Sequence, residues 1–157
     1  MGKFEDFMSG VKVLEEVNSP INGKIQVVRS LGLGTYIQVE GLTQSGGVVS
    51  DVWKTTLRKI QNQNVKIQKC LILGLGAGSA AKLIRKYWQY SEITGIEIDP
   101  VMVELGRKYF KLDEARVDVV IEDAENFLLA ISHQPSVIKY DLILVDLYLG
   151  YSVPQKF

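Results

Sequence analysis

Hydrophobic and polar residues follow one pattern before Asn64 and another after it. In the first part, alternation with a period of two predicts three short strands, over residues 11–17, 24–31 and 35–42. The glycines of "GLG" between the last two segments suit a tight turn, so we expect those two strands to form a hairpin. Apolar residues at helical spacing between Val49 and Ile60 predict a helix, which the polar run "QNQN" ends.

In the second part of the chain, strand-like and helix-like segments alternate. Four apolar runs are typical of buried parallel strands: "KCLILG", "EITGIEI", "VDVVI" and "YDLILVD". Asp99, which Pro100 follows, and Asp123 are suited to begin two of the intervening helices as N-caps. Repeated strand–helix units predict an α/β fold with a doubly wound, mostly parallel sheet. We therefore divide the chain into a β-hairpin region with a helix, residues 1–63, and a Rossmann-like core, residues 64–157.

Charge and composition narrow the classes of partner. The 157 residues contain 18 basic and 18 acidic side chains, so no net field attracts nucleic acid or an anionic membrane, and we expect neither as a partner. One cysteine and one histidine exclude an internal disulfide and a zinc site built from several such ligands. We expect Cys70 to pack in the core and His133 to be solvated or to cap a helix. No apolar run reaches the ~20 residues of a membrane helix, so we expect a cytoplasmic protein.

Candidate chemistry lies where the predicted parallel strands end, since ligands of such sheets bind beyond the carboxyl ends of the strands. The first strand runs into glycines, which tolerate positive φ and let a ligand touch the backbone. Glu97 ends the second strand, where a carboxylate accepts both hydroxyls of a ribose or is only a solvated acid. Asp123 ends the third and suits an adenine amino group, although an N-cap role alone explains it. Asp146 closes the fourth, where burial raises the pKa of a carboxyl and suits it to proton abstraction, unless it only caps a loop.

The spacing of the glycines indicates the kind of nucleotide. Gly74, Gly76 and Gly78 form G-x-G-x-G, whereas a dinucleotide fingerprint needs its third glycine at the place of Ser79. No phosphate-loop lysine follows, which disfavours nucleoside triphosphates. The pattern favours an adenosyl ligand without a pyrophosphate, such as S-adenosylmethionine, over a nicotinamide cofactor.

The order of these motifs resembles the spermidine synthase-like branch of the class I S-adenosylmethionine-dependent methyltransferase fold, with its small N-terminal β-region. The segments that carry the resemblance are "SPINGKIQVVRSLGLGTYIQVEGLTQSG", "LILGLGAGS", "GIEIDPVMVELGRKYF", "VIEDAENFL" and "YDLILVDLY". The resemblance implies S-adenosylmethionine or its decarboxylated form as the cofactor, Asp146 as the catalytic acid–base, and a weaker acceptor role for Gln44 and Tyr148. It implies that the cofactor is bound by Gly74, Gly76, Ala77, Gly78, Glu97, Ile98, Asp123 and Ala124.

Departures from the family's pattern concern the amine substrate. Aminopropyltransferases usually have an aspartate where this chain has Ala77, and a second one shortly after the position of Asp146. In the family, a helix start with a tyrosine and a histidine holds the polyamine. The corresponding segment of this chain is "SDVWKTTL", in which only Asp51 and Trp53 could take the place of those two residues. The resemblance therefore implies alkyl transfer of the aminopropyl type to a small-molecule amine or other nucleophile, without specifying a polyamine. Methyl transfer, which Ala77 favours, and a non-catalytic binding or assembly module stay open as alternatives.

The family's sheet continues beyond the strand that Asp146 closes, so the resemblance implies a form truncated after the fourth core strand. That strand is apolar on both faces and we expect cover on each side of it. The hairpin region adds a second sheet edge. Unpaired edges favour association, and we therefore expect a homodimer or a higher oligomer.

Overall fold

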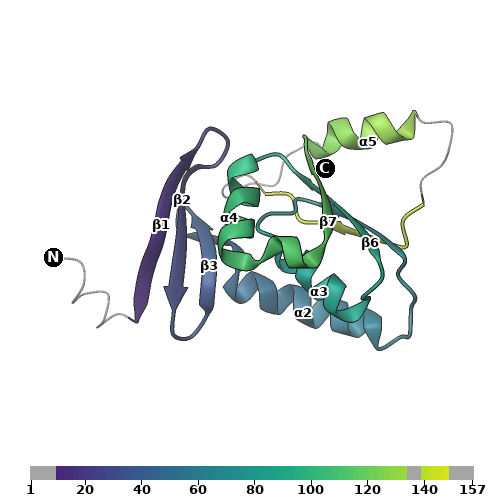
Figure 1. Ribbon diagram of the computed structural model, residues 1–157, viewed down its shortest axis with the longest axis horizontal. Helices are drawn as coiled ribbons and strands as arrows, with labels where there is room; N and C mark the ends of the chain where they lie inside the picture. Colours follow the sequence, from purple (N-terminus) through teal and green to yellow (C-terminus); the bar gives the residue numbers. More distant parts are fainter. Residues whose placement is uncertain (1–9, 134–138, 149–157) are drawn as a thin grey trace.

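The computed structural model describes residues 10–133 and 139–148, which form two β-sheets lying side by side (Figure 1). The first sheet is antiparallel, in the order β1-β2-β3-β4, and consists of β1 (Val11–Ser19), β2 (Gly23–Ser30), β3 (Gly34–Val39) and β4 (Leu42–Gly46). The three predicted strands and the β2–β3 hairpin are confirmed. Sequence reasoning missed β4, because "LTQSG" has neither alternation nor β-branched enrichment.

The second sheet is parallel, in the order β7-β6-β5-β8. Its strands are β5 (Lys69–Leu73), β6 (Glu92–Glu97), β7 (Val117–Ile121) and β8 (Leu142–Val145), as predicted. The expectation that all four are buried is wrong for β7 and β8, which form the edges of the sheet as far as the structure describes it. In β8, Ile143 and Val145 are 52% and 57% exposed. The strand pairs with β5 on one edge only, and no helix among the described residues covers these two side chains.

The helix predicted between Val49 and Ile60 and the two predicted to begin at Asp99 and Asp123 are confirmed. The helices among the described residues are α2 (Gly47–Gln61), α3 (Ser79–Tyr87), α4 (Pro100–Phe110) and α5 (Ala124–Ser132), with a short 3₁₀ turn, η1 (Leu112–Ala115). Asp99 caps α4 by accepting from the Val101 N–H, and Asp123 caps α5 through two backbone N–H groups. His133 is the exposed C-cap of α5, as expected.

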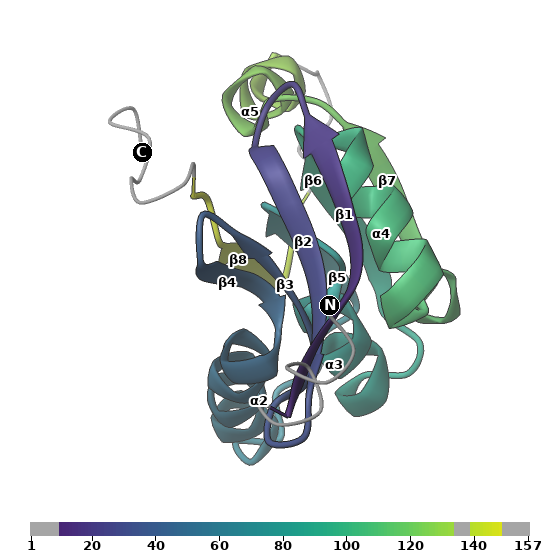
Figure 2. The same ribbon diagram turned by 90° about the vertical axis from the view of Figure 1, so that its left-hand side faces the viewer.

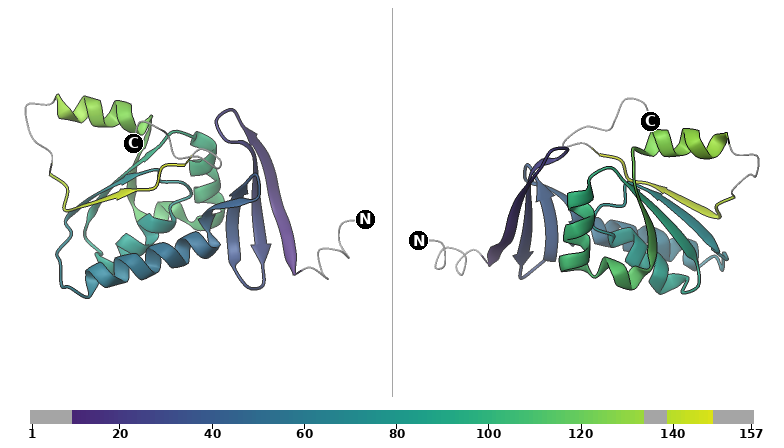
Figure 3. Two further views of the ribbon diagram at one scale, coloured as in Figure 1. Left: turned by 180° about the vertical axis from the view of Figure 1, so that it is seen from behind. Right: turned by 45° about the horizontal axis from the view of Figure 1, so that its top comes forward.

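Helices cover both faces of the parallel sheet. Seen from behind, α2 runs along one face and α5 lies over the other (Figure 3). The alternation of β5 explains this, since Cys70 and Ile72 pack into the core beneath α2 and α3, while Leu71 and Leu73 pack with α5. Burial raises the pKa of the Cys70 thiol to about 12, which fits its predicted packing role.

Helix α4 joins the two sheets. Figure 2 shows β1 and β2 in front of it. Its apolar side chains form one core with inward-facing residues of the first sheet, namely Ile25, Val27, Ile37, Val39, Met102, Leu105 and Phe110. This core fixes the first sheet against the carboxyl-end edge of the second. Among the described residues, no helix has the length and apolar character needed to cross a membrane, and no cluster of acidic, histidine and cysteine side chains is arranged to hold a metal ion.

Candidate functional site

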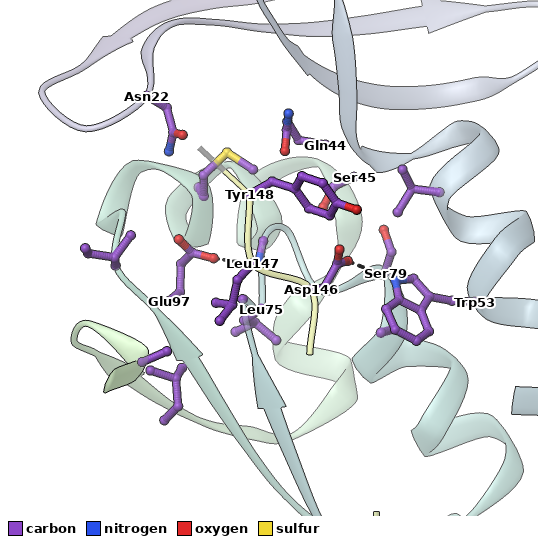
Figure 4. Close-up of a pocket in the computed structure, with 18 of the residues that line it drawn as sticks. Asn22, Gln44, Ser45, Trp53, Leu75, Ser79, Glu97, Asp146, Leu147 and Tyr148 are labelled. Atoms are coloured by element: carbon purple, nitrogen blue, oxygen red, sulfur yellow. Dashed lines mark hydrogen bonds between the residues drawn. The ribbon is translucent and has the colours of Figure 1, made fainter. Parts of the chain in front are cut away.

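A cavity of about 220 Å³ opens at the carboxyl ends of β5, β6 and β8 (Figure 4). The sheet topology places it there, because parallel strands end at one edge and the turns that follow them meet. Predicted site residues that line it are Gln44, Gly74, Gly76, Glu97, Ile98, Asp123, Ala124, Asp146 and Tyr148. Segments from residue 44 to residue 148 are therefore brought together around one space.

The glycine turn has the predicted positive φ, with values of 84° at Gly74 and 55° at Gly76. A Cβ added to Gly76 would meet the Ser45 Oγ at 2.7 Å, and one added to Gly74 would meet the backbone of Asp146, so the bare α-carbons make room for neighbouring protein atoms. Both glycines also line the cavity, and the expectation that a ligand contacts their backbone stays a prediction.

Ala77 and Gly78, two of the predicted cofactor-binding residues, are not among the residues that line the cavity. Ala77 is fully buried and its N–H donates to the Ser45 Oγ at 2.9 Å. A Cβ on Gly78 would meet Leu112. Both residues belong to the turn that precedes α3, whose first two residues, Ser79 and Ala80, line the cavity.

Glu97 is 8% exposed and its carboxylate faces the cavity from the end of β6 (Figure 4). Oε2 accepts the Gly76 N–H at 2.7 Å, and Oε1 accepts the Asp99 N–H at 3.0 Å. Burial raises the pKa of this carboxyl, although the backbone donors oppose the shift. A carboxylate oxygen has room for more than one donor, so Glu97 can hold the glycine turn and accept hydroxyl groups of a ligand.

The ends of β6 and β7 supply a second group of lining residues. Asp123 Oδ1 accepts the N–H groups of Glu125 and Asn126, so the N-cap role of Asp123 is confirmed. Asp123 also lines the cavity, as do the buried Ala124 and the 39% exposed Ile98. An apolar slot with a carboxylate at its rim suits a planar heterocycle.

Asp146 follows β8 and is half-buried. Its Oδ2 accepts a hydrogen bond from the Trp53 indole N–H at 3.0 Å. Burial raises the pKa of Asp146, and the Trp53 hydrogen bond lowers it in part. A carboxyl with a raised pKa in a cavity is suited to accept a proton. Of the two predicted stand-ins on α2, Trp53 is in the site, whereas Asp51 is exposed in a separate surface hollow.

Several residues of the site carried no sequence signal. Ser45 and Ser79 form two hydrogen bonds that join the end of β4 to the start of α3 and the turn before it. The Ser45 Oγ accepts from the Ala77 N–H, and the Ser79 Oγ accepts from the Gly46 N–H at 2.8 Å. Asn22 lines the cavity from the β1–β2 turn. The fully buried Asp99 holds that turn, because its Oδ2 accepts from the Asn22 Nδ2 at 2.6 Å and from the Ser19 Oγ at 2.5 Å.

Residues 55–154 match the family model described as the spermine/spermidine synthase domain. The chain belongs to this family. A polyamine aminopropyltransferase of Clostridioides difficile strain 630 is 30% identical over 129 residues, which are 78% of this chain and 44% of that protein. The family member described here thus spans less than half the length of the curated relatives it matches.

Solved structures agree on the fold. The spermidine synthase from Thermotoga maritima is 21% identical, with a TM-score of 0.69 over 86% of this chain and 46% of that one. A spermidine synthase in complex with the transition-state analogue AdoDATO gives the same TM-score and identity, over 86% and 47%. Human methyltransferase-like protein 13 in complex with SAH is 23% identical, with a TM-score of 0.50 over 68% and 47%. The family member therefore has the class I methyltransferase-type α/β fold, with an antiparallel sheet at its N-terminal end.

Proposed function

We propose that this chain binds an adenosyl nucleoside of the S-adenosylmethionine type and transfers an alkyl group from it to a nucleophile. One observation carries the proposal: Gly76, Glu97, Asp123 and Asp146 line a single cavity at the carboxyl ends of the parallel strands. Family membership supports it, as does the AdoDATO complex of a spermidine synthase with the same fold.

Each residue has a part in the binding that its contacts support. Glu97 accepts the ribose hydroxyls on the lone pairs that Gly76 and Asp99 leave open. Asp123, Ala124 and Ile98 take the adenine at the end of the cavity formed by β6 and β7. The sulfur then lies on the side of Asp146, and Gln44 and Tyr148 lie beside the incoming nucleophile.

The transfer is an in-line displacement. The sulfonium supplies a good leaving group, so the carbon–sulfur bond breaks with its electron pair as the nucleophile attacks the carbon. Asp146 removes a proton from the nucleophile, for which its raised pKa suits it. The cavity contributes proximity and orientation, and the hydrogen bond from Trp53 fixes the Asp146 carboxylate.

We infer that the group transferred is of the aminopropyl type, because the polyamine aminopropyltransferase and the spermidine synthases are the relatives that cover most of this chain. The test is to incubate the chain with an amine and with either S-adenosylmethionine or its decarboxylated form. The sulfur-containing nucleoside that remains after transfer is then identified by mass spectrometry. Methylthioadenosine from the decarboxylated nucleoside supports the proposal. S-adenosylhomocysteine from S-adenosylmethionine would establish methyl transfer instead, and binding without either product would establish a non-catalytic module.

We also propose that the chain associates with copies of itself. Exposed apolar side chains on β8, such as Ile143 and Val145, and the edge strand β1 support this. Sedimentation equilibrium at micromolar concentration tests it, and a well-behaved monomer would contradict it. The cytoplasmic location expected from the sequence stays a prediction.

A further inference from the structure

Two buried serine hydroxyls line the cavity and have a proton to donate. Ser45 and Ser79 are 3% and 8% exposed, and both belong to the lining (Figure 4). Each oxygen accepts one backbone N–H, from Ala77 and Gly46 respectively. Among the described residues, no acceptor takes the proton of either hydroxyl. A buried O–H without an acceptor is unfavourable, so this wall of the cavity suits a ligand group that accepts hydrogen bonds.

The start of α3 forms part of the same wall. Ser79 and Ala80 are the first two residues of the helix, and both line the cavity. Gly78 is the N-cap, and no side chain caps the helix. The first N–H groups of a helix have no partner within the helix, and the helix dipole favours a negative charge beside them. Together with the two hydroxyls, the helix start favours an anionic acceptor such as a carboxylate.

The acids of the cavity that lie toward β6 and β7 have donors of their own. Glu122 and Asp123 accept backbone N–H groups at the start of α5, and Glu97 accepts two backbone N–H groups. The glycine turn, residues 74–78, contains no charged side chain. None of the described lining residues is a lysine, arginine or histidine. A ligand carboxylate at this wall would therefore be held by hydrogen-bond donors and not by a cation.

We propose that the nucleoside is intact S-adenosylmethionine, and that its α-carboxylate accepts hydrogen bonds from Ser45 and Ser79 at the start of α3. This inference rests on the proposed function, which places the ribose at Glu97 and the sulfur on the side of Asp146. An aminopropyl-type transfer from the intact nucleoside moves a 3-amino-3-carboxypropyl group. This group differs from the aminopropyl group only in the carboxylate that the two serines hold.

The transfer needs no further reactant. The bond between the sulfonium sulfur and the γ-carbon of the methionine part breaks, and its electron pair stays on the sulfur, which leaves in neutral methylthioadenosine. The amine nitrogen forms the new bond to the γ-carbon, and its proton passes to Asp146. The α-carboxylate takes no part in bond breaking and remains on the product.

Calorimetry with three nucleosides tests the proposal. The chain is titrated with S-adenosylmethionine, with its decarboxylated form, and with methylthioadenosine, which lacks the amino-acid part. We expect the intact nucleoside to bind about tenfold more tightly than the decarboxylated one, because its carboxylate receives charge-assisted hydrogen bonds. Ser45→Ala and Ser79→Ala are each expected to reduce this preference and to leave the affinity for methylthioadenosine unchanged.

The outcomes separate this proposal from the proposed function. Equal or tighter binding of the decarboxylated nucleoside would overturn it, as would an undiminished preference in both folded variants. An equal loss of affinity for methylthioadenosine in the variants would show that the serines only maintain the shape of the site, and would overturn it too. Failure of the unchanged chain to bind methylthioadenosine would instead overturn the proposed function.

A charge placed at the wall gives an independent test. Ser79→Asp keeps an acceptor for the Gly46 N–H and suits a helix start, but its carboxylate repels that of the ligand. It is expected to reverse the preference toward the decarboxylated nucleoside. Lys82→Gln is the matched control, because it changes the net charge equally on an exposed position of α3 outside the lining. An unchanged preference in folded Ser79→Asp, or the same reversal in Lys82→Gln, would contradict the proposal.

The products test the group that is transferred. The chain is incubated with S-adenosylmethionine and with either butylamine or 1,4-diaminobutane, and the products are identified by mass spectrometry. We expect methylthioadenosine together with an amine product that carries the added carboxyl group. Release of S-adenosylhomocysteine, or no product from the intact nucleoside with either amine, would overturn the transfer of this group.

Discussion

The backbone N–H of Gly76 donates to the Oε2 of Glu97 at 2.7 Å, which joins the turn after β5 to the end of β6. The next N–H in the same turn, that of Ala77, donates to Ser45 on β4. The glycine turn is thus held from the parallel sheet on one side and from the antiparallel sheet on the other. Its conformation depends on both contacts.

Gly76→Ala is expected to destabilise the protein by about 1–3 kcal/mol, because its φ of 55° disfavours a side chain and the new Cβ meets Ser45 Oγ at 2.7 Å. Ser45→Ala removes that oxygen and also the acceptor of Ala77. Thermal or urea unfolding of both single variants and the double variant measures the coupling. We expect the double variant to lose less stability than the sum of the single losses, and simple additivity would mean that the contact does not matter.

Asp99 is expected to hold the β1–β2 turn over the cavity. Its carboxylate is fully buried and accepts from Ser19, Asn22 and the Val101 N–H. Asp99→Ala leaves those donors without an acceptor, at an expected loss of about 2–4 kcal/mol of stability.

Asp99→Asn is the matched comparison, since its amide keeps the size and one acceptor oxygen. We expect it to lose less stability than Asp99→Ala in denaturant unfolding. Equal stability of Asp99→Ala and the unchanged protein would show that this buried cluster does not stabilise the fold.

The activity is expected to fall toward low pH in a way set by Asp146. Burial raises the pKa of this carboxyl, and proton removal requires its ionised form. The acid limb of kcat/KM should therefore lie above the ordinary aspartate range of about 4. Trp53 stabilises the ionised form, so Trp53→Phe should move that limb to still higher pH.

Trp88→Phe is the control for this pH profile. Because Trp88 lies outside the cavity, the acid limb of kcat/KM in this variant should stay at the pH found for the unchanged protein. A Trp53→Phe variant whose limb moves to lower pH, or stays in place, would remove Trp53 from the account of the Asp146 pKa.

Local sequence patterns predicted much of the fold because the forces that they report are local. Asp99 and Asp123 each cap a helix whose first turn follows at once in the sequence. The apolar runs predicted the four parallel strands. Because ligands of parallel sheets bind beyond the carboxyl ends of the strands, the strand ends indicated Glu97 and Asp146 as site residues. Burial of β7 and β8 was overestimated, because an apolar run does not show whether its strand has a neighbour on each side.

Contacts between distant residues had no such signal. Trp53 and Asp146 are 93 residues apart in the chain, and Asn22 and Asp99 are 77 apart. A serine such as Ser45 has ordinary surroundings in sequence, and its role comes from the register of β4 against the glycine turn. The contacts of Asn22 and Ser45 depend on how the two sheets are docked, and that of Trp53 on how α2 packs against the parallel sheet, which one sequence does not specify.

The central claim is that Glu97 holds an adenosyl nucleoside, and isothermal titration calorimetry tests it most directly. The chain is titrated in parallel with S-adenosylmethionine, its decarboxylated form, methylthioadenosine and NAD. Glu97→Gln, which keeps the size of the side chain, is compared with Glu92→Gln at the exposed start of β6. We expect at least one adenosyl ligand to bind more tightly than NAD. Glu97→Gln is expected to weaken the binding of that ligand at least about tenfold, through loss of about 1.5–3 kcal/mol of binding free energy. Glu92→Gln is expected to leave the affinity unchanged. Undiminished affinity in folded Glu97→Gln, or no affinity of the unchanged chain for any adenosyl ligand, would contradict the account.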